Sequence, residues 1–368
     1  MPAFSKEFHI SAADSSLSLS LTTGLLAVSM LVAGALSEMI GRKMVMTASL
    51  LSAAALTIVS SLVPSWPALL VFRAIEGIAF SGLPAVAMAY LAEEMDPASV
   101  GLAMGLYIGG SALGGMSGRF IAGVLADLGS WRIGVGAIGA FSFVAGIIFW
   151  RSLPPSRHFH RRVLSIRHSL HTYGEHLTDY GLCLLFSVGF LAMGSFVTLY
   201  NYVGYRLVAP PYFLNQTAIG AIFLVYLVGI FSSSWVGDLA GRLGRRNVLW
   251  ANVVLMLAGL FVTLAHPLAW IIVGIALLTF GFFGAHSVLS SWVGMRARHS
   301  KAQASSLYLF FYYLGSSIVG TAGGFFWSSS HWLGVVLFVS SLLALALAIS
   351  LILIGVKPLA HSTAAVRA

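Results

Sequence analysis

The sequence is poor in cysteine and in charge. It contains one cysteine, Cys183, among 368 residues. A single thiol cannot form a disulfide within the chain or a cysteine-based metal cluster. Charged residues make up 8% of the sequence, whereas a soluble domain carries about 25%. This composition excludes a soluble globular domain, because no water-facing surface can be built from so few charges.

Long apolar runs occupy most of the chain instead. Hydrophobic residues make up 58% of it, and 39 residues are glycine. About 20 apolar residues in a helix cross the hydrocarbon core of a bilayer, and small residues let such helices pack closely. We therefore predict an all-α membrane protein with eleven spans. The predicted spans are residues 17–36, 44–63, 68–92, 100–126, 132–153, 181–203, 215–236, 247–265, 268–293, 303–327 and 332–355.

A loop sequence of ten residues occurs twice. Residues 34–43 (GALSEMIGRK) and 237–246 (GDLAGRLGRR) match at an offset of 203, and a second set of positions between 106 and 131 recurs at an offset of 201. Because two independent sets of positions recur at nearly the same offset, the sequence indicates an internal duplication. Its period is far longer than that of a solenoid repeat. We divide the chain into an N-terminal bundle (1–153), a basic linker (154–180), a C-terminal bundle (181–356) and a tail (357–368).

The two halves differ in their number of predicted spans. Five spans precede the linker and six follow it, and the partner of the span at 181–203 would lie ahead of Met1. We therefore expect two six-helix bundles, the first lacking its first helix. Either Met1 is an internal methionine of a longer gene or the chain is a truncated relative. We favour the internal methionine, because the remaining sequence shows no decay.

Basic residues are distributed unevenly over the loops. With alternate loops on opposite sides of the membrane, 15 of the 20 lysines and arginines fall on one side. The positive-inside rule makes this side cytoplasmic, and the linker and both copies of the loop lie on it. The net charge of +9 thus reflects topology, and we expect no nucleic-acid partner. Five histidines lie between residues 158 and 176. Since no second ligand motif accompanies them, we predict a solvated basic loop with no metal site and no cofactor.

The repeated loop resembles the signature of the major facilitator superfamily, Gly-x-Leu-x-Asp-x-x-Gly-Arg-Lys/Arg. Residues 69–77 are similar to the fourth-helix motif of that family, and residues 110–119 to its fifth-helix antiporter motif. The second likeness departs from the family pattern, since Gly115 replaces the usual proline and Arg119 the usual glycine. The whole chain is similar to bacterial inner-membrane permeases of the YnfM type, also labelled arabinose-efflux-like. The resemblance implies two bundles, alternating access and a bacterial cytoplasmic (inner) membrane.

The loop motif predicts a latch that holds one conformation. Gly41 and Gly244 allow a sharp reversal between helices, and Gly34 and Gly237 allow backbones to approach closely. A plain turn with cytoplasmic cations explains part of this pattern. The predicted latch residues are Gly34, Glu38, Gly41, Arg42, Lys43, Glu93, Glu94, Gly237, Gly244, Arg245 and Arg246.

An acidic residue at the membrane face is the part that a plain turn leaves unexplained, because an unpaired charge there is costly. The resemblance implies that Glu38 pairs with Arg42 near the start of the eleventh family helix, with Glu93 or Glu94 as a further partner. The second copy has Gly241 in place of the acid. We expect that copy to latch weakly or not at all.

Three charged residues, Arg73, Glu76 and Arg119, lie inside predicted spans. Arg73 and Glu76 are three residues apart and therefore share a helix face. A structural ion pair is one interpretation. Intramembrane ionisable groups usually line transport pathways, and three on consecutive helices favour a functional role. We predict that Glu76 carries a proton, under the influence of the two arginines.

Polar and aromatic residues of the second half are candidates for a substrate cavity. They are Tyr200, Asn201, Tyr202, His286, Tyr308 and Tyr312. For each the alternative is a packing role, since buried rings with satisfied polar tips are common. Such a lining favours a moderately apolar, drug-like molecule over a sugar, which would require more amide and acid groups.

We expect a secondary transporter that exports a small organic molecule or metabolite by proton antiport. Its partners would be that molecule, a proton and membrane lipids, and it would act as a monomer and not as an enzyme. A non-transporting membrane receptor, an inactive transporter fragment and a sugar efflux permease are the alternatives. An intramembrane enzyme would need paired acids or a metal cluster, which Glu76 alone does not supply.

Overall fold

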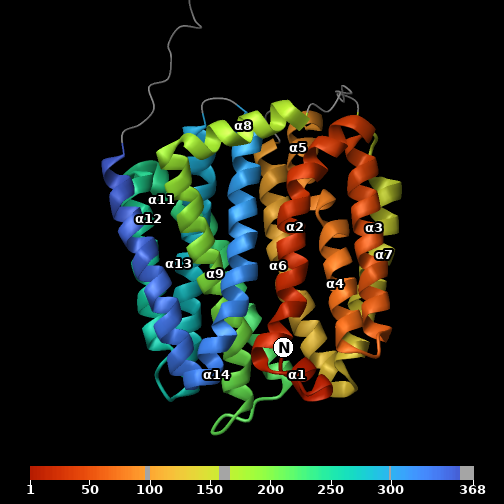
Figure 1. Ribbon diagram of the computed structural model, residues 1–368, viewed down its shortest axis with the longest axis vertical. Coiled ribbons are helices and arrows are strands. Elements are labelled where there is room, and N and C mark those ends of the chain that lie inside the picture. The colour runs from red at the N-terminus through yellow and green to blue at the C-terminus, as the bar shows by residue number, and fades with distance from the viewer. Residues whose placement is uncertain (96–99, 157–165, 298–299, 357–368) are drawn as a thin grey trace, which may run out of the picture.

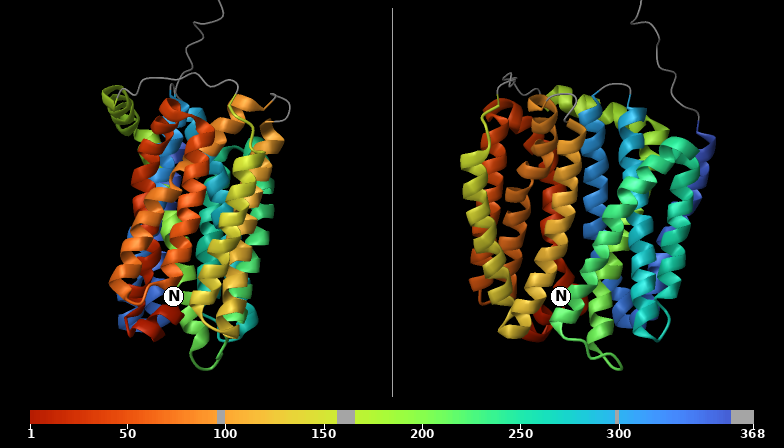
Figure 2. Two further views of the ribbon diagram at one scale, coloured as in Figure 1. Left: turned by 90° about the vertical axis from the view of Figure 1, so that its right-hand side faces the viewer. Right: turned by 180° about the vertical axis from the view of Figure 1, so that it is seen from behind.

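The computed structural model describes residues 1–95, 100–156, 166–297 and 300–356, and its regular elements are helices. The long helices stand side by side in two groups, one formed before the linker and one after it (Figure 1). The same division is visible from behind, in the right-hand view of Figure 2. The predicted all-α membrane fold is confirmed.

The first group contains helices α1 to α7. A short helix precedes α2, whose first turn is capped by Ser11, the Oγ of which accepts the Asp14 N–H at 3.0 Å. The bounds are α1 (Pro2–Phe8), α2 (Ala12–Ile40), α3 (Arg42–Leu62), α4 (Trp66–Phe80), α5 (Gly82–Glu94), α6 (Val100–Leu128) and α7 (Trp131–Ser152).

The predicted span 68–92 is divided into α4 and α5. Pro84 causes the division, because proline has no N–H and its ring clashes with the carbonyl four residues earlier, here that of Phe80. The break frees the N–H of Leu83, which donates to Ser49 Oγ on α3 at 3.0 Å. The membrane crossing therefore contains an interruption that hydropathy alone did not predict.

The second group contains helices α9 to α14. The predicted span 215–236 consists of α10, a 3₁₀ turn η1 and α11, and two predicted spans are joined in α14. Non-helical backbone angles at Ser330 and His331 mark the kink between them. The bounds are α9 (Tyr180–Val208), α10 (Gln216–Ile222), η1 (Phe223–Val225), α11 (Tyr226–Leu243), α12 (Arg245–Val262), α13 (Leu268–Arg296) and α14 (Lys301–Gly355).

Among the described residues, nine helices are long and apolar enough to cross a membrane, with the residues 303–355 of α14 counted once. Helix α6 occupies the position of the predicted span 100–126. The total of eleven spans and the missing first helix stay predictions.

The linker contains a helix that the sequence did not indicate. Helix α8 (Ile166–Thr178) lies across the ends of the long helices (Figure 1). The Tyr173 hydroxyl donates to the carbonyl of Leu31 on α2 at 3.5 Å, and burial raises its pKa. The linker is thus not a solvated loop throughout. His158 and His160 lie outside the described residues, and within those residues no group of three potential metal ligands occurs.

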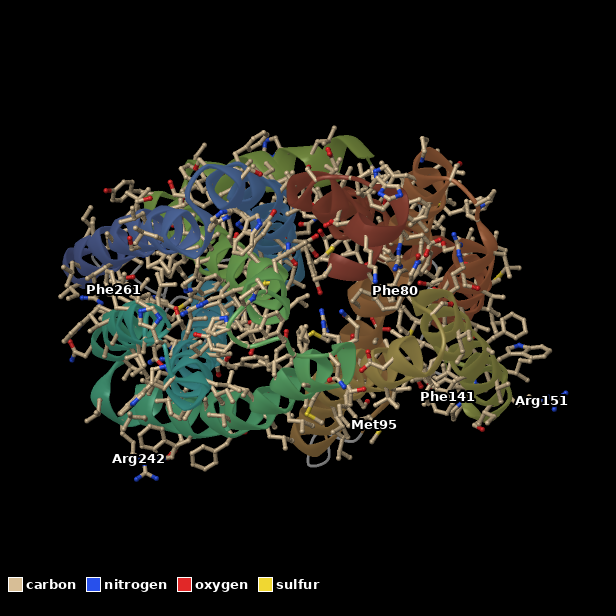
Figure 3. All side chains as sticks on the ribbon, turned by 90° about the horizontal axis from the view of Figure 1, so that it is seen from below. Phe80, Met95, Phe141, Arg151, Arg242 and Phe261 are labelled. Carbon is tan, nitrogen blue, oxygen red and sulfur yellow. The ribbon has the colours of Figure 1, made fainter. Side chains whose placement is uncertain are left out.

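The two groups meet along two seams, seen from below in Figure 3. In the first seam α2 packs against α14, where Ser317 Oγ donates to the Ser20 carbonyl at 2.7 Å and Thr321 Oγ1 donates to Ser20 Oγ at 2.6 Å. In the second seam the carboxylate of Asp127 on α6 accepts the N–H groups of the first two residues of α10, at 3.0 and 2.6 Å. Both sets of bonds lie toward the end of the molecule opposite α8, which the charge distribution makes extracytoplasmic.

Candidate functional site

A buried ion pair lies inside the first group of helices. Arg73 Nη1 and Glu76 Oε2 are 2.9 Å apart, as the spacing on α4 predicts. The other carboxylate oxygen accepts a hydrogen bond of 2.6 Å from Thr57 Oγ1 on α3. Glu76 is 9% exposed, and the buried Nε of Arg73 has no hydrogen-bond partner among the described residues. The carboxylate is therefore held by one cation and one hydroxyl.

Helix α2 fixes the backbone of this pair. Thr22 Oγ1 donates to the Arg73 carbonyl at 3.0 Å. A Cβ atom at Gly77 would lie 2.2 Å from the Thr22 carbonyl oxygen, so this position admits only glycine without movement of the backbone. Together α2, α3 and α4 position a titratable group within the membrane.

Arg119, the third intramembrane charge, forms no ion pair with Glu76 within the described residues. Its Nη1 donates to the Gly115 carbonyl at 2.9 Å. Its guanidinium carbon lies 5.0 Å from the ring centre of Phe223 and 5.8 Å from that of Tyr226, both in the second half. Arg119 belongs to the first half of the chain, but these cation–π contacts place its guanidinium against aromatic residues of the second half.

Those rings belong to a continuous aromatic cluster of α9, η1, α11, α13 and α14. Tyr200 lies 4.9 Å from Phe223 and 5.4 Å from Tyr226 between ring centres. The hydroxyls of Tyr200 and Thr279 share a hydrogen bond of 2.9 Å. The cluster consists of Phe196, Tyr200, Phe223, Tyr226, Phe282, Phe283, His286, Tyr308 and Tyr312.

The predicted residues His286, Tyr308 and Tyr312 lie together at one end of the cluster. His286 Nδ1 and the Tyr308 hydroxyl share a hydrogen bond of 2.7 Å. The centres of the His286 and Tyr312 rings are 4.6 Å apart. The histidine is thus satisfied by a neighbouring hydroxyl, as the packing alternative requires.

The other two cavity candidates lie elsewhere. The Tyr202 hydroxyl donates to the Gly320 carbonyl at 3.0 Å, and its ring contacts those of Tyr205 and Trp327. Tyr202 is fully buried, so it packs α9 against α14. Asn201 is also buried, and its Nδ2 has no hydrogen-bond partner among the described residues.

The predicted latch is built around Arg42. Its Nη2 and Nε contact the two carboxylate oxygens of Glu93 at 2.8 and 3.1 Å. Glu38, the expected partner, lies farther away at 3.6 Å, and Ser37 Oγ and the Gly34 carbonyl accept the remaining Arg42 donors. No contact of Glu38 with α14 is found within the described part of the chain. Helix α5 supplies the main acid of the latch, and Glu94 ends that helix.

The glycines of the latch behave in two ways. Gly41 and Gly244 have φ angles of 105° and 86°, which confirms the predicted need for glycine at these reversals. The predicted close approach at Gly34 is wrong, because a Cβ atom there would have no neighbour within 4 Å. At Gly237 the near neighbour is the Ser287 side chain at 3.1 Å and not a backbone.

In the second copy of the loop the ion pair is an exposed one between Arg242 and Asp238, at 2.8 Å, and Arg245, the counterpart of Arg42, forms no ion pair within the described residues. Arg245 Nε instead donates to Ser291 Oγ at 3.3 Å. The last motif position is alike in both copies, since Lys43 Nζ donates to the carbonyl of Leu153 at 2.5 Å and Arg246 to those of Ile354 and Val356 at 2.8 and 2.5 Å. Each of these cations caps the last helix of its own group.

Thr57, Phe223 and Tyr226 are site residues that the sequence analysis missed. Thr57 is one of many hydroxyl residues within apolar runs, and the two aromatic residues stand among many others. No feature of a single sequence distinguishes them, because their importance follows from which helices meet.

Similarity to known proteins extends over nearly the whole chain. The Major Facilitator Superfamily profile matches residues 1–320. The chain is 52% identical to the uncharacterized MFS-type transporter YybF of Bacillus subtilis, over 95% of this chain and 87% of that protein. It is 48% identical to the inner membrane transport protein YnfM of Escherichia coli, over 94% of this chain and 83% of the relative.

Solved structures show the same fold at low sequence identity. The nucleoside transporter NupG aligns with a TM-score of 0.77 and 14% identity, over 95% of this chain and 93% of that one. A bacterial homologue of the human lysosomal transporter Spinster, in an inward-facing and occupied conformation, aligns with a TM-score of 0.76 and 15% identity, over 97% and 91%.

Proposed function

The chain belongs to the Major Facilitator Superfamily of transporters and lies in the inner membrane as a multi-pass protein, and from that premise we propose that it exports a small organic molecule in exchange for protons. The observation that carries the proposal is the buried carboxylate of Glu76, held by Arg73 and Thr57. Charged groups inside a membrane are costly and are kept where they line pathways or relay protons.

Glu76 is the proposed proton carrier. The ionised carboxylate accepts from Arg73 at 2.9 Å and from Thr57 at 2.6 Å. Protonation removes its charge and weakens the bond to Arg73, while loss of the proton restores the pair. The two protonation states thus favour different arrangements of α3 and α4, which is the differential interaction that a coupled conformational change requires.

The proposed substrate contacts are Arg119 and the aromatic cluster. Arg119 forms no ion pair within the described residues, and its positive charge faces the rings of Phe223 and Tyr226. A moderately apolar molecule with an aromatic ring would stack on these rings, and an acidic group on it would neutralise Arg119. The amide and acid groups that a sugar would require are scarce among the described residues of the cluster.

The test replaces Glu76 by Gln, which keeps the size and a hydrogen-bonding carbonyl but cannot bind or release the proton. A substrate is first found by screening dyes, antibiotics, aromatic acids and sugars for export in a host without other pumps. The full chain is then reconstituted in vesicles. We expect Glu76→Gln to exchange labelled for unlabelled substrate but to lose accumulation driven by a pH gradient.

The exchange reaction is the internal control, because it reports folding and substrate binding without proton coupling. Accumulation by Glu76→Gln with the pH dependence of the unmodified protein would exclude Glu76 as the carrier. Loss of folded protein from the membrane on the same substitution would instead identify the pair with Arg73 as structural, since breaking a buried pair typically costs about 3–5 kcal/mol.

A further inference from the structure

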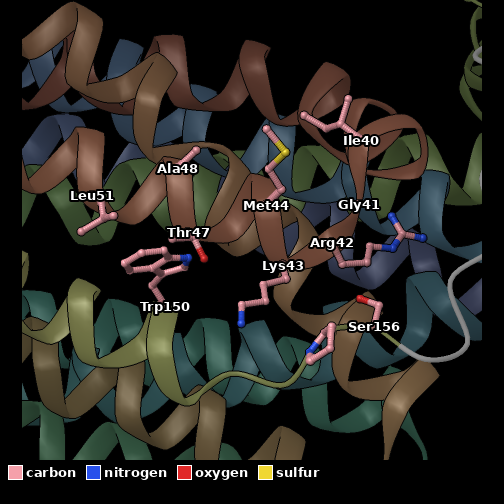
Figure 4. Close-up of a pocket in the computed structure, with 11 residues that line it drawn as sticks. Ile40, Gly41, Arg42, Lys43, Met44, Thr47, Ala48, Leu51, Trp150 and Ser156 are labelled. Atoms are coloured by element: carbon pink, nitrogen blue, oxygen red, sulfur yellow. The ribbon is translucent and has the colours of Figure 1, made fainter.

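A groove opens at the cytoplasmic end of the first group of helices, between the start of α3 and the end of α7 (Figure 4). Its volume is about 610 Å³, and its lining includes Gly41, Lys43, Thr47, Trp150 and Ser156. It is separate from the aromatic cluster and from the ion pair of Arg73 and Glu76.

Two hydroxyl groups of this groove lack hydrogen-bond partners. Thr47 is 8% exposed, and its buried Oγ1 has no partner among the described residues. In contrast, Thr22, Thr57 and Thr198 each donate to the carbonyl four residues earlier, at 2.7 to 3.0 Å. The buried Oγ of Ser156 is also without a partner. An unsatisfied buried hydroxyl is unfavourable, so both groups point to a ligand that accepts hydrogen bonds.

The groove also carries an excess of positive charge. The guanidinium of Arg42 is neutralised by Glu93, but Lys43 has only the Leu153 carbonyl as a partner in the described part of the chain. Gly41 supplies no side chain to cap α3, a helix of 21 residues. The free N–H groups of the first turn of α3 therefore favour an anion at the same place.

The remaining lining is apolar and faces outward. Met44 and Trp150 are 63% and 51% exposed, and Ala48 and Leu51 continue the groove along α3 toward the middle of the membrane. Tryptophan and lysine at this depth are typical of the boundary between headgroups and acyl chains. Helices α3 and α7 form the lateral edge of the first group, where lipid surrounds the protein (Figure 1).

We propose that this groove binds an anionic phospholipid, with its phosphate against Lys43 and the start of α3. The hydroxyls of Thr47 and Ser156 donate to the phosphate and glycerol oxygens. One acyl chain lies along Met44, Ala48 and Leu51. The occupant is a lipid and not free phosphate, because the apolar part of the groove continues from the polar part.

The internal duplication supplies a natural comparison. At the offset of 203, Trp250 stands in place of Thr47, and Arg246 in place of Lys43. An indole at this position removes the hydroxyl and occupies the space that a headgroup would need. The basic residue is therefore shared by both copies, whereas the hydroxyl is present only in the first.

The test measures lipids retained by the purified full chain in native mass spectrometry. Dioleoyl phosphatidylglycerol and dioleoyl phosphatidylcholine are offered at equal concentration. We expect a preference for the anionic lipid that Lys43→Gln lowers roughly fivefold, the effect of one basic residue near an anionic lipid. Thr47→Trp, which copies the second half, should abolish the preference at this site.

Arg246→Gln is the matched control, because it removes the equivalent cation where Trp250 stands, and it should leave the preference unchanged. Ala48→Trp blocks the groove from an exposed position and decides the matter if Thr47→Trp does not fold. Folded Thr47→Trp or Ala48→Trp protein with the full preference for phosphatidylglycerol would overturn the proposal. Equal displacement of the lipid by soluble glycerol phosphate would also overturn it, since the site would then bind free phosphate.

Discussion

Arg42 illustrates how one side chain connects a sequence motif to a residue outside it. The motif places Glu38 one helical turn before Arg42, and the two do approach to 3.6 Å. The bidentate contact of Arg42, however, is with the carboxylate of Glu93 on α5, at 2.8 and 3.1 Å. Arginine and carboxylate bind most strongly in this paired geometry. The stabilising partner of Arg42 is therefore Glu93.

We predict that Glu93→Gln destabilises the protein more than Glu38→Gln does. Loss of the charged, paired acceptor should cost about 1–3 kcal/mol. Loss of the longer and more exposed contact of Glu38 should cost less than about 1 kcal/mol. Thermal unfolding of the two purified variants in the same detergent measures the difference. A lower unfolding midpoint for Glu38→Gln than for Glu93→Gln would show that the motif acid is the main partner.

At this scale the sequence predicted contacts within a helix better than contacts between helices. The pair of Arg73 and Glu76 follows from helical spacing alone, and the structure places them 2.9 Å apart. The intramembrane charge of Arg119 could also be predicted, but not its direction. Its cation–π partner Phe223 comes from a helix 104 positions later in the chain. Such a pairing depends on how the two groups of helices dock, which one sequence does not specify.

At the scale of elements, the break between α4 and α5 shows what a hydropathy pattern overlooks. The run 68–92 is apolar throughout its length, so it was predicted as one span. Pro84 interrupts it, and Ser49 on α3 accepts the N–H of Leu83 that the break leaves free. The sequence shows the proline that breaks the helix, but it does not show that Ser49 lies close enough to accept the N–H group that the break leaves free.

We predict that Ser49→Ala destabilises the protein, because the Leu83 N–H would lose its acceptor in a region without water. A hydrogen bond of this kind contributes about 0.5–1.5 kcal/mol. Ser52→Ala is the control, since Ser52 lies one turn later on α3, is exposed and donates only to carbonyls of its own helix. A lower unfolding midpoint for Ser49→Ala alone is expected. Equal midpoints for both variants would mean that the break needs no support from α3.

The interruption of α14 was predicted from the sequence, whereas helix α8 was not. The two spans joined in α14 were predicted with a boundary at 328–331, where Ser330 and His331 have non-helical angles. Helix α8 was not predicted, because its sequence is polar and lacks a long apolar run. It is stabilised by burial of side chains such as Tyr173 against the long helices, and that burial is a tertiary effect.

At the scale of the whole molecule, the two seams define the conformation. Hydrogen bonds join Ser20 to Thr321, and Asp127 to the start of α10, near the extracytoplasmic ends. Close backbone contact accompanies them, since a Cβ atom at Gly123 would lie 2.5 Å from the Gln216 carbonyl oxygen. The two groups are thus closed together on the extracytoplasmic side, and transport by alternating access requires these seams to separate.

We predict that a disulfide across the first seam arrests transport. The hydroxyl oxygens of Ser20 and Thr321 are 2.6 Å apart. Two cysteine sulfur atoms at these positions would therefore lie near the length of an S–S bond, which is about 2.05 Å. Cysteines at both positions, in a chain with Cys183→Ser, should lose reactivity toward a thiol-specific polymer label on mild oxidation. Transport should stop and then return on reduction, while each single-cysteine chain should be unaffected. Undiminished transport by the oxidised double variant would show that this seam does not open.

The repeat in the sequence predicted the architecture of two groups without any structural information. It did so because the loop and the helix positions recur at nearly the same offset, which only a duplicated unit produces. The division of roles between the groups was less evident. Arg73, Glu76 and Arg119, the charged residues of the predicted spans, lie in the first group, and the whole aromatic cluster lies in the second, where the guanidinium of Arg119 contacts it.

The cations that end each loop motif also have a consequence for biosynthesis. Lys43 bonds to Leu153 and Arg246 to Val356, so each links the first loop of its own group to the end of the last helix. The first of these bonds involves only residues that are translated before the linker, so both partners leave the ribosome before the C-terminal group is complete. The N-terminal group therefore contains both partners of the contact that joins its loop motif to the end of α7. It can assemble in the bilayer while the second half of the protein is still being synthesised.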